Sequence, residues 1–131
     1  MNNSVQALRE SYQVLVEICK QVAILPKNLK YSLGEKMENF AFDFVAEVCL
    51  ATKAFGFAEK ISHLQNAKKT LLLCEIAIKT CCDVGKLAHQ IYKPLLEKIN
   101  ELSNQISKRE NFCKTKLKEQ EDLLAMVQTH G

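Results

Sequence analysis

The 131-residue chain contains only four glycines and two prolines, the residues that most often interrupt helices. A β-sandwich or β-barrel needs many tight turns, so this scarcity argues against both folds. No apolar run approaches the roughly 18 residues of a membrane-spanning helix, so we expect no membrane association. The first residues, Met1 to Ser4, lack the basic and apolar stretches of a signal peptide, which leads us to expect a cytoplasmic protein.

The signatures of common catalytic and cofactor sites are also missing. The glycines are isolated, which argues against a phosphate-binding loop, and the chain has no C-x-x-C, H-E-x-x-H or E-x-x-H motif. We therefore expect no enzymatic activity, no metal and no cofactor. One alternative is an enzyme or metal protein in which Cys81, Cys82 and His89 converge at a turn, although their spacing matches no common zinc site.

Glu59 and His63 stand four residues apart, a spacing at which two side chains meet on a helix surface. A catalytic interpretation would make His63 a base that Glu59 orients. No nucleophile has an obvious place beside them, so we interpret the pair as a solvated surface contact.

Six cysteines fall mostly on or beside apolar stripes, where a cysteine behaves as a small hydrophobic residue. They are Cys19, Cys49, Cys74, Cys81, Cys82 and Cys113. A reducing cytosol keeps thiols free, so we predict buried free thiols and no disulfide framework.

Four stretches of apolar residues at helical spacing dominate the chain. The first stretch steps by three or four residues at a time: Val5, Leu8, Tyr12, Leu15, Cys19 and Val22. Such spacing places one apolar stripe on a helix, and the stripe has to be buried. We expect helices over about 4–24, 33–58, 62–85 and 92–118, and a charged tail over 114–131 that is either continuing helix or a frayed end. The prediction is an all-α, antiparallel up-and-down four-helix bundle, with residues 1–131 in a single domain.

Local signals set most of the expected helix ends. Pro26 should stop the first helix, because the residue before a proline avoids the α-helical region. Ser32 and Glu35 form the S-x-x-E pattern of a capping box, which predicts the start of the second helix. Gly85 suits a left-handed residue after the third helix, and Pro94 suits the first turn of the fourth.

The net charge of +3 is unevenly distributed. Residues 61–94 carry five lysines and two acidic residues, which makes the third helix and its exit loop the basic element; Lys27 and Lys30 form a second basic feature. A solvated polar face is one interpretation of these lysines. The other is a surface for nucleic-acid phosphates, without base stacking along the third helix because that helix has no aromatic residue.

Two predicted helices carry more apolar residues than one stripe requires. In the second helix and the turn after it these are Ala41, Phe42, Val45, Cys49, Phe55 and Phe57, and in the third they are Leu72, Leu73, Ile76 and Ala77. Central helices of a monomeric bundle have wide apolar arcs, and so do helices at a subunit interface.

The segment from Leu25 to Met37, LPKNLKYSLGEKM, resembles the Avd-like four-helix-bundle family. It has a hydrophobic-Pro-Lys loop, then Lys-Tyr-Ser-Leu-Gly at the start of a long helix. The likeness in helix order extends over roughly residues 10–110, and Gly85-Lys86-Leu87 matches in position as the break before the fourth helix. The family includes accessory variability determinants of diversity-generating retroelements and proteins encoded in ribosomal RNA intervening sequences.

The resemblance implies a non-enzymatic homopentameric barrel. In the retroelement branch such a protein associates with a reverse transcriptase and binds template RNA or cDNA through basic surfaces during mutagenic retrohoming. The Phe55-Gly56-Phe57 turn is closer to that branch. The alternative is an intervening-sequence-type bundle that acts as a structural or interaction module without a reverse transcriptase. Carried to this chain, the nucleic-acid-binding candidates are Lys27, Lys30, Lys68, Lys69, Lys79 and Lys86.

Overall fold

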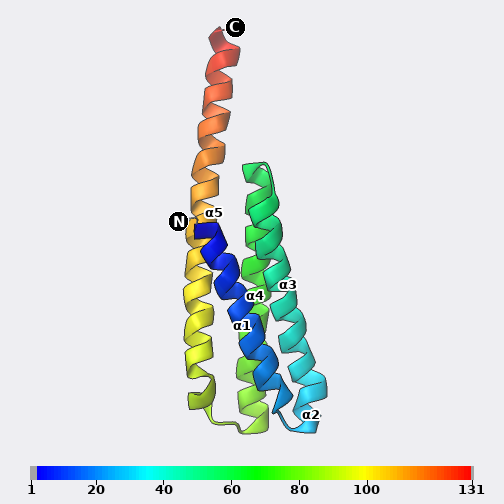
Figure 1. Ribbon diagram of the computed structural model, residues 1–131. Coiled ribbons are helices and arrows are strands. Elements are labelled where there is room, and N and C mark those ends of the chain that lie inside the picture. The colour runs from blue at the N-terminus through cyan, green and yellow to red at the C-terminus, as the bar shows by residue number, and fades with distance from the viewer. Residues whose placement is uncertain (1–2, 131) are drawn as a thin grey trace.

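A computed structural model describes residues 3–130, and within that range every regular element is a helix. The long helices are α1 (Asn3–Ala23), α3 (Glu35–Lys53), α4 (Phe57–Gly85) and α5 (His89–His130). A single turn, α2 (Lys27–Leu29), and a π-helical turn, η1 (Lys30–Gly34), lead into α3. The long helices run up and down beside one another (Figure 1), so the predicted all-α bundle is confirmed.

One hydrophobic core lies between the helices. α3 packs against both α1 and α4, α4 packs against α5, and α1 contacts α5 less extensively. The largest side chains with almost no exposure are Ile18, Val22, Met37, Phe44, Leu71, Ile78, Leu102 and Ile106. They come from all the long helices, so burial of an apolar stripe on each accounts for the arrangement. The stripe of α1 differs from the predicted one, because Val5 and Tyr12 are 45% and 59% exposed while Val14 and Ile18 are buried.

The predicted capping box at Ser32 is wrong. The helix of this region begins at Lys27 and passes through η1 into α3 without a break, so Ser32 lies inside it. Its Oγ donates to the carbonyl of Asn28 at 2.8 Å. The backbone N–H of Glu35 donates to the carbonyl of Ser32, which leaves no free N–H for a cap.

The turn between α3 and α4 comes earlier than predicted. Helices over 33–58 and 62–85 were expected, but α3 ends at Lys53 and α4 begins at Phe57. The Nζ of Lys60 donates to the carbonyls of Ala51 and Thr52 at 3.0 and 3.3 Å. These carbonyls lie at the end of α3, where a helix lacks its own donors, so Lys60 supports a very short turn.

α4 ends at Gly85 as expected, but the left-handed residue is Lys86, with φ of 52°. The N–H of Leu87 donates to the carbonyl of Cys82 at 3.0 Å, the bond of a Schellman motif. Gly85 also lies close to the side chain of Leu29. A Cβ at this position would lie 2.5 Å from Leu29 Cδ1, so the glycine lets α2 approach the end of α4.

α5 begins at His89, earlier than the predicted start near 92, and Pro94 lies inside it. Pro94 is the sixth residue of the helix and removes one backbone bond, to the carbonyl of Gln90 in an exposed turn. At its other end α5 continues to His130, so the charged tail is helical rather than frayed. It projects beyond the rest of the bundle (Figure 1). We call the end with this projection the open end, and the end with α2 and Gly85 the loop end.

Candidate nucleic-acid interface

Three of the six candidate lysines are at the loop end. Lys27 begins α2, Lys30 begins η1, and Lys86 follows α4. Leu29 lies between the two lysines of the first pair and reaches the position of Gly85, and η1 packs against α4. Two segments more than fifty residues apart in the sequence therefore carry their lysines to the same end of the bundle.

The loop-end lysines remain available for an external anion. Lys27 and Lys86 are exposed and Lys30 is half-buried. None of them forms an ion pair with another residue in the described range 3–130. The Nζ of Lys30 lies 5.7 Å from the ring centroid of Tyr31, whose side chain is 60% exposed. The loop end thus presents cations and one accessible aromatic ring.

Lys68 is occupied instead by a buried carboxylate. Its Nζ lies 2.8 Å from Oε1 of Glu110, which is only 4% exposed. Lys114 lies 2.9 Å from the other oxygen of Glu110, and Gln65 donates to that oxygen at 3.1 Å. Hydrogen bonds from Lys68 and Lys114 lower the pKa of Glu110 from its ordinary 4.5 to about 2, against the opposing effect of burial. Lys68 therefore holds α4 to α5.

The remaining two candidates lie on α4. Lys79 lies 3.6 Å from Glu75 at the i,i+4 spacing, a solvent-exposed contact that contributes little. Lys69 is exposed and has no ion-pair partner among residues 3–130. Lys27, Lys30 and Lys86 thus lie at the loop end, and Lys68, Lys69 and Lys79 lie on α4.

Sequence reasoning missed the Glu110 network. Its partners Gln65 and Lys68 are more than forty residues away, beyond any local spacing rule. One signal was present, because Glu110 occupies a position of the apolar stripe between Ile106 and Cys113. An acid at a core position of a helix needs a partner, which indicates a cation on a neighbouring helix.

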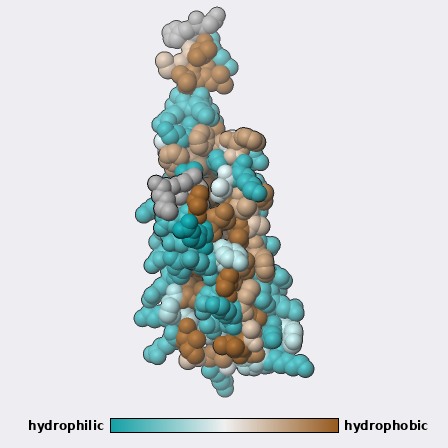
Figure 2. Space-filling model, in the orientation of Figure 1, coloured by the Kyte–Doolittle hydropathy of each residue, from teal (hydrophilic) through white to brown (hydrophobic). Residues whose placement is uncertain are grey.

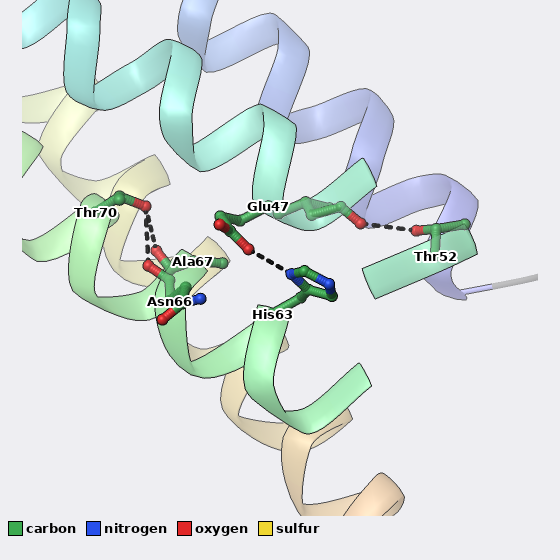
Figure 3. A network of polar contacts seen from close by, with 7 residues as sticks. Glu47, Thr52, His63, Asn66, Ala67 and Thr70 are labelled. Atoms are coloured by element: carbon green, nitrogen blue, oxygen red, sulfur yellow. Dashed lines mark hydrogen bonds and ion pairs between the residues drawn. The ribbon is translucent and has the colours of Figure 1, made fainter. Parts of the chain in front are cut away.

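His63 does not pair with Glu59. Its Nδ1 lies 2.7 Å from Oε2 of Glu47 on α3, and both side chains are about a quarter exposed. Figure 3 shows this contact between α3 and α4, with Thr52 and Thr70 donating to carbonyls of their own helices. Glu59 faces solvent. The interaction links two helices, which the predicted surface contact within one helix would not do.

The cysteines are free thiols among the described residues. Cys74, Cys81, Cys82 and Cys113 are buried, whereas Cys19 and Cys49 are half-buried. Burial raises the pKa of Cys81 and Cys82. His89 is exposed and lies 3.2 Å from Asp83, so the structure does not bring these three residues together. Within residues 3–130, no group of three His, Cys, Asp or Glu side chains is placed to hold a metal ion.

Several of the additional apolar residues are exposed. Phe42 is 57% exposed and Phe55 fully exposed, Leu72 and Ile76 about half, while Ala41 and Ala77 belong to the core. Tyr12, on the neighbouring helix α1, is also 59% exposed. Figure 2 shows apolar atoms in a broken band down the face where α1 and α3 lie.

Comparisons with protein-family models, curated proteins and solved structures gave no match. The resemblance to the Avd-like family therefore depends on the loop residues and the helix pattern. None of the helices within residues 3–130 has the length of apolar sequence that crossing a membrane requires.

Proposed function

We propose that this protein is a non-enzymatic accessory protein of a diversity-generating retroelement. It binds template RNA or cDNA at the loop end and associates with the reverse transcriptase. The observation that carries the proposal is the placement of Lys27, Lys30 and Lys86 at one end without ion-pair partners in the described chain. The first two belong to the segment that resembles the family.

The chemistry of the loop end suits a nucleic-acid backbone. Lysines contact phosphates as point charges, and each contact releases counterions, so binding weakens as salt rises. Tyr31 offers an exposed ring beside Lys30 on which a base of a single strand can stack. The overall charge of +3 is modest, so affinity must come from this local concentration of cations rather than from the whole surface.

Assembly into a homopentamer would multiply a weak site. We infer that the exposed apolar side chains Tyr12, Phe42, Leu72 and Ile76 contribute to contacts between copies. Five loop ends on one particle would engage one strand at several points, which raises the overall affinity without a new contact.

The test is the salt dependence of RNA binding. Replacing Lys27 and Lys86 by Glu should weaken binding to a single-stranded RNA and reduce the slope of log K against log salt by about 1.4, or 0.7 per lost contact. The matched control replaces Lys53 and Lys118 by Glu as well. These two exposed lysines lie at the opposite end, so the slope of log K against log salt should stay unchanged. An unaltered slope in the loop-end variant contradicts the proposed site.

The reverse transcriptase partnership needs its own test. Co-purification with a reverse transcriptase encoded beside the gene supports the retroelement assignment. Absence of such a neighbouring gene, together with no RNA binding, supports the intervening-sequence-type module instead.

A further inference from the structure

A cavity of about 410 Å³ lies between the helices at the open end of the bundle, on the side of the turn between α3 and α4 (Figure 1). All four long helices contribute residues to its lining. Gln6, Lys108 and Phe112 belong to this lining and are exposed, so solvent reaches the cavity. Its volume is typical of a site for one small molecule, which is about 300–1,000 Å³.

The part of the cavity that faces the middle of the bundle is apolar. Val48, Leu64 and Ile106 line it from α3, α4 and α5, and all three belong to the buried core. Ala7 and Ala51 also line the cavity. Their side chains end at the Cβ atom, which leaves room between the helices. We call these five residues the floor of the cavity.

Cationic side chains line the cavity nearer the open end. On α4, Lys60 lies four residues before Leu64, and on α5, Arg109 lies three residues after Ile106. Both steps are about one helical turn, and both lead towards the open end because α4 begins there and α5 projects beyond it. The cavity therefore has an apolar floor and a basic rim.

The positive charge of the rim is not neutralised within the cavity. Lys60, Lys108 and Arg109 are among the described residues that line it, and no Asp or Glu is. Lys108 and Arg109 form no ion pair with another residue in the range 3–130. The guanidinium of Arg109 lies 5.0 Å from the ring centroid of Phe112, a contact that orients it. An external anion can therefore pair with these two cations.

Lys60 adds its charge although it also supports the turn between α3 and α4. Its ammonium has three N–H groups, and the carbonyls of Ala51 and Thr52 accept two of them. Burial raises the pKa of the Cys113 thiol, and the positive charges of Arg109 and Lys60 oppose that rise. Cations from α4 and α5 therefore act on the same region.

We propose that this cavity binds a small organic anion, with an apolar body against the floor and a carboxylate, sulfonate or phosphate group at Lys108 and Arg109. The planar guanidinium of Arg109 can donate two parallel hydrogen bonds to such a group. An anion without an apolar body would leave the floor uncovered, and an uncharged molecule would leave the cations without a partner. The site shares no residue with the loop end and is independent of nucleic-acid binding there.

Two fluorescent dyes test the rim in the full-length chain. 8-Anilinonaphthalene-1-sulfonate has an apolar body and one negative charge, and N-phenyl-1-naphthylamine is the same molecule without the sulfonate. Lys108→Gln with Arg109→Gln should raise the Kd of the sulfonate dye at least about tenfold and leave that of the uncharged dye unchanged. The matched control, Lys27→Gln with Lys86→Gln, removes two exposed cations at the loop end and should change neither Kd. A wild-type chain that does not bind the sulfonate dye, or a rim variant that binds it as the wild type does, overturns the proposal.

The floor needs a separate test, because the sulfonate dye could pair with the cations alone. Ala7→Phe places a large side chain in the cavity from a half-buried position on α1 and should weaken binding of both dyes. In the wild type, decanoate should displace the sulfonate dye, whereas acetate, which has the same charged group without an apolar body, should not. Unchanged binding of both dyes to a folded Ala7→Phe variant, or displacement by acetate at the same concentration as by decanoate, contradicts the assigned cavity.

Discussion

Among the Asp, Glu, Lys, Arg and His side chains of the described residues, Glu110 is buried most completely, at 4% exposure. Its carboxylate accepts bonds from Lys68, Lys114 and Gln65, which connect α4 and α5 near the open end. A buried carboxylate is stable only with such partners, and removing one partner leaves the charge without compensation. Removing the carboxylate of Glu110 should therefore lower the free energy of unfolding, and the size of this effect should depend on pH.

Glu110→Gln should lower the free energy of unfolding at pH 7 by about 2 kcal/mol, because the neutral amide loses two charged partners. The folded pKa of Glu110 is about 2, below the ordinary 4.5. Its contribution is therefore complete above about pH 4.5 and is lost as the pH falls towards 2. Urea unfolding of both proteins at several pH values measures the difference.

The matched control for this experiment is Glu101→Gln, since Glu101 is exposed and makes one long contact with Lys98 at 3.6 Å. It should change stability by less than about 0.5 kcal/mol at every pH. A difference between wild type and Glu110→Gln that does not shrink below pH 4.5 would contradict the assigned pKa.

Helix ends depend on contacts that local sequence signals do not contain. The apolar stripes predicted all the long helices, because burial of one face at helical spacing determines where a helix can pack. The ends at Ser32, at the turn before Phe57 and at His89 were predicted wrongly. The interactions there include hydrogen bonds from the Nζ of Lys60 on α4 to two carbonyls of α3, which no helix-end signal in the sequence predicts.

At the loop end, too, the candidate site depends on contacts between distant segments that local sequence signals do not contain. The sequence marked Lys27, Lys30 and Lys86 individually, but their shared location depends on Leu29 packing over Gly85. Conversely, the predicted strip from Lys68 to Lys79 was reasonable from an eleven-residue spacing. The structure adds that Glu110 of another helix binds Lys68. Long-range pairing decides which cations remain available.

Two substitutions at the end of α4 should change the stability of the protein in opposite directions. Gly85→Ala should destabilise the protein, because the new Cβ would lie 2.5 Å from the buried side chain of Leu29. Lys86→Gly should stabilise it by about 1 kcal/mol, because glycine adopts a positive φ without the steric cost that lysine has. Thermal unfolding at pH 7 measures both changes. Lys86→Ala serves as the control, since it removes the charge and keeps the strain.

At the scale of the whole molecule, the exposed apolar surface occurs in separate regions. Tyr12 and Phe42 lie along α1 and α3, and Leu72 and Ile76 lie along α4. Leu123, Leu124, Met126 and Val127 lie near the C-terminal end of α5. Isolated apolar side chains are normal on a protein surface, but several on adjacent helices indicate contacts between copies. A cyclic assembly that uses two different patches can close into a ring.

The mass of the particle in reducing solution tests this view directly. Five copies of the 14.9 kDa chain would weigh about 75 kDa by light scattering. Tyr12→Asp with Phe42→Asp should lower that mass, since a charge placed in an apolar contact is costly. If this variant keeps the wild-type mass, these two side chains do not contribute to contacts between copies. A single mass near 14.9 kDa contradicts self-association and leaves the loop-end lysines without the multivalency that would make their binding strong.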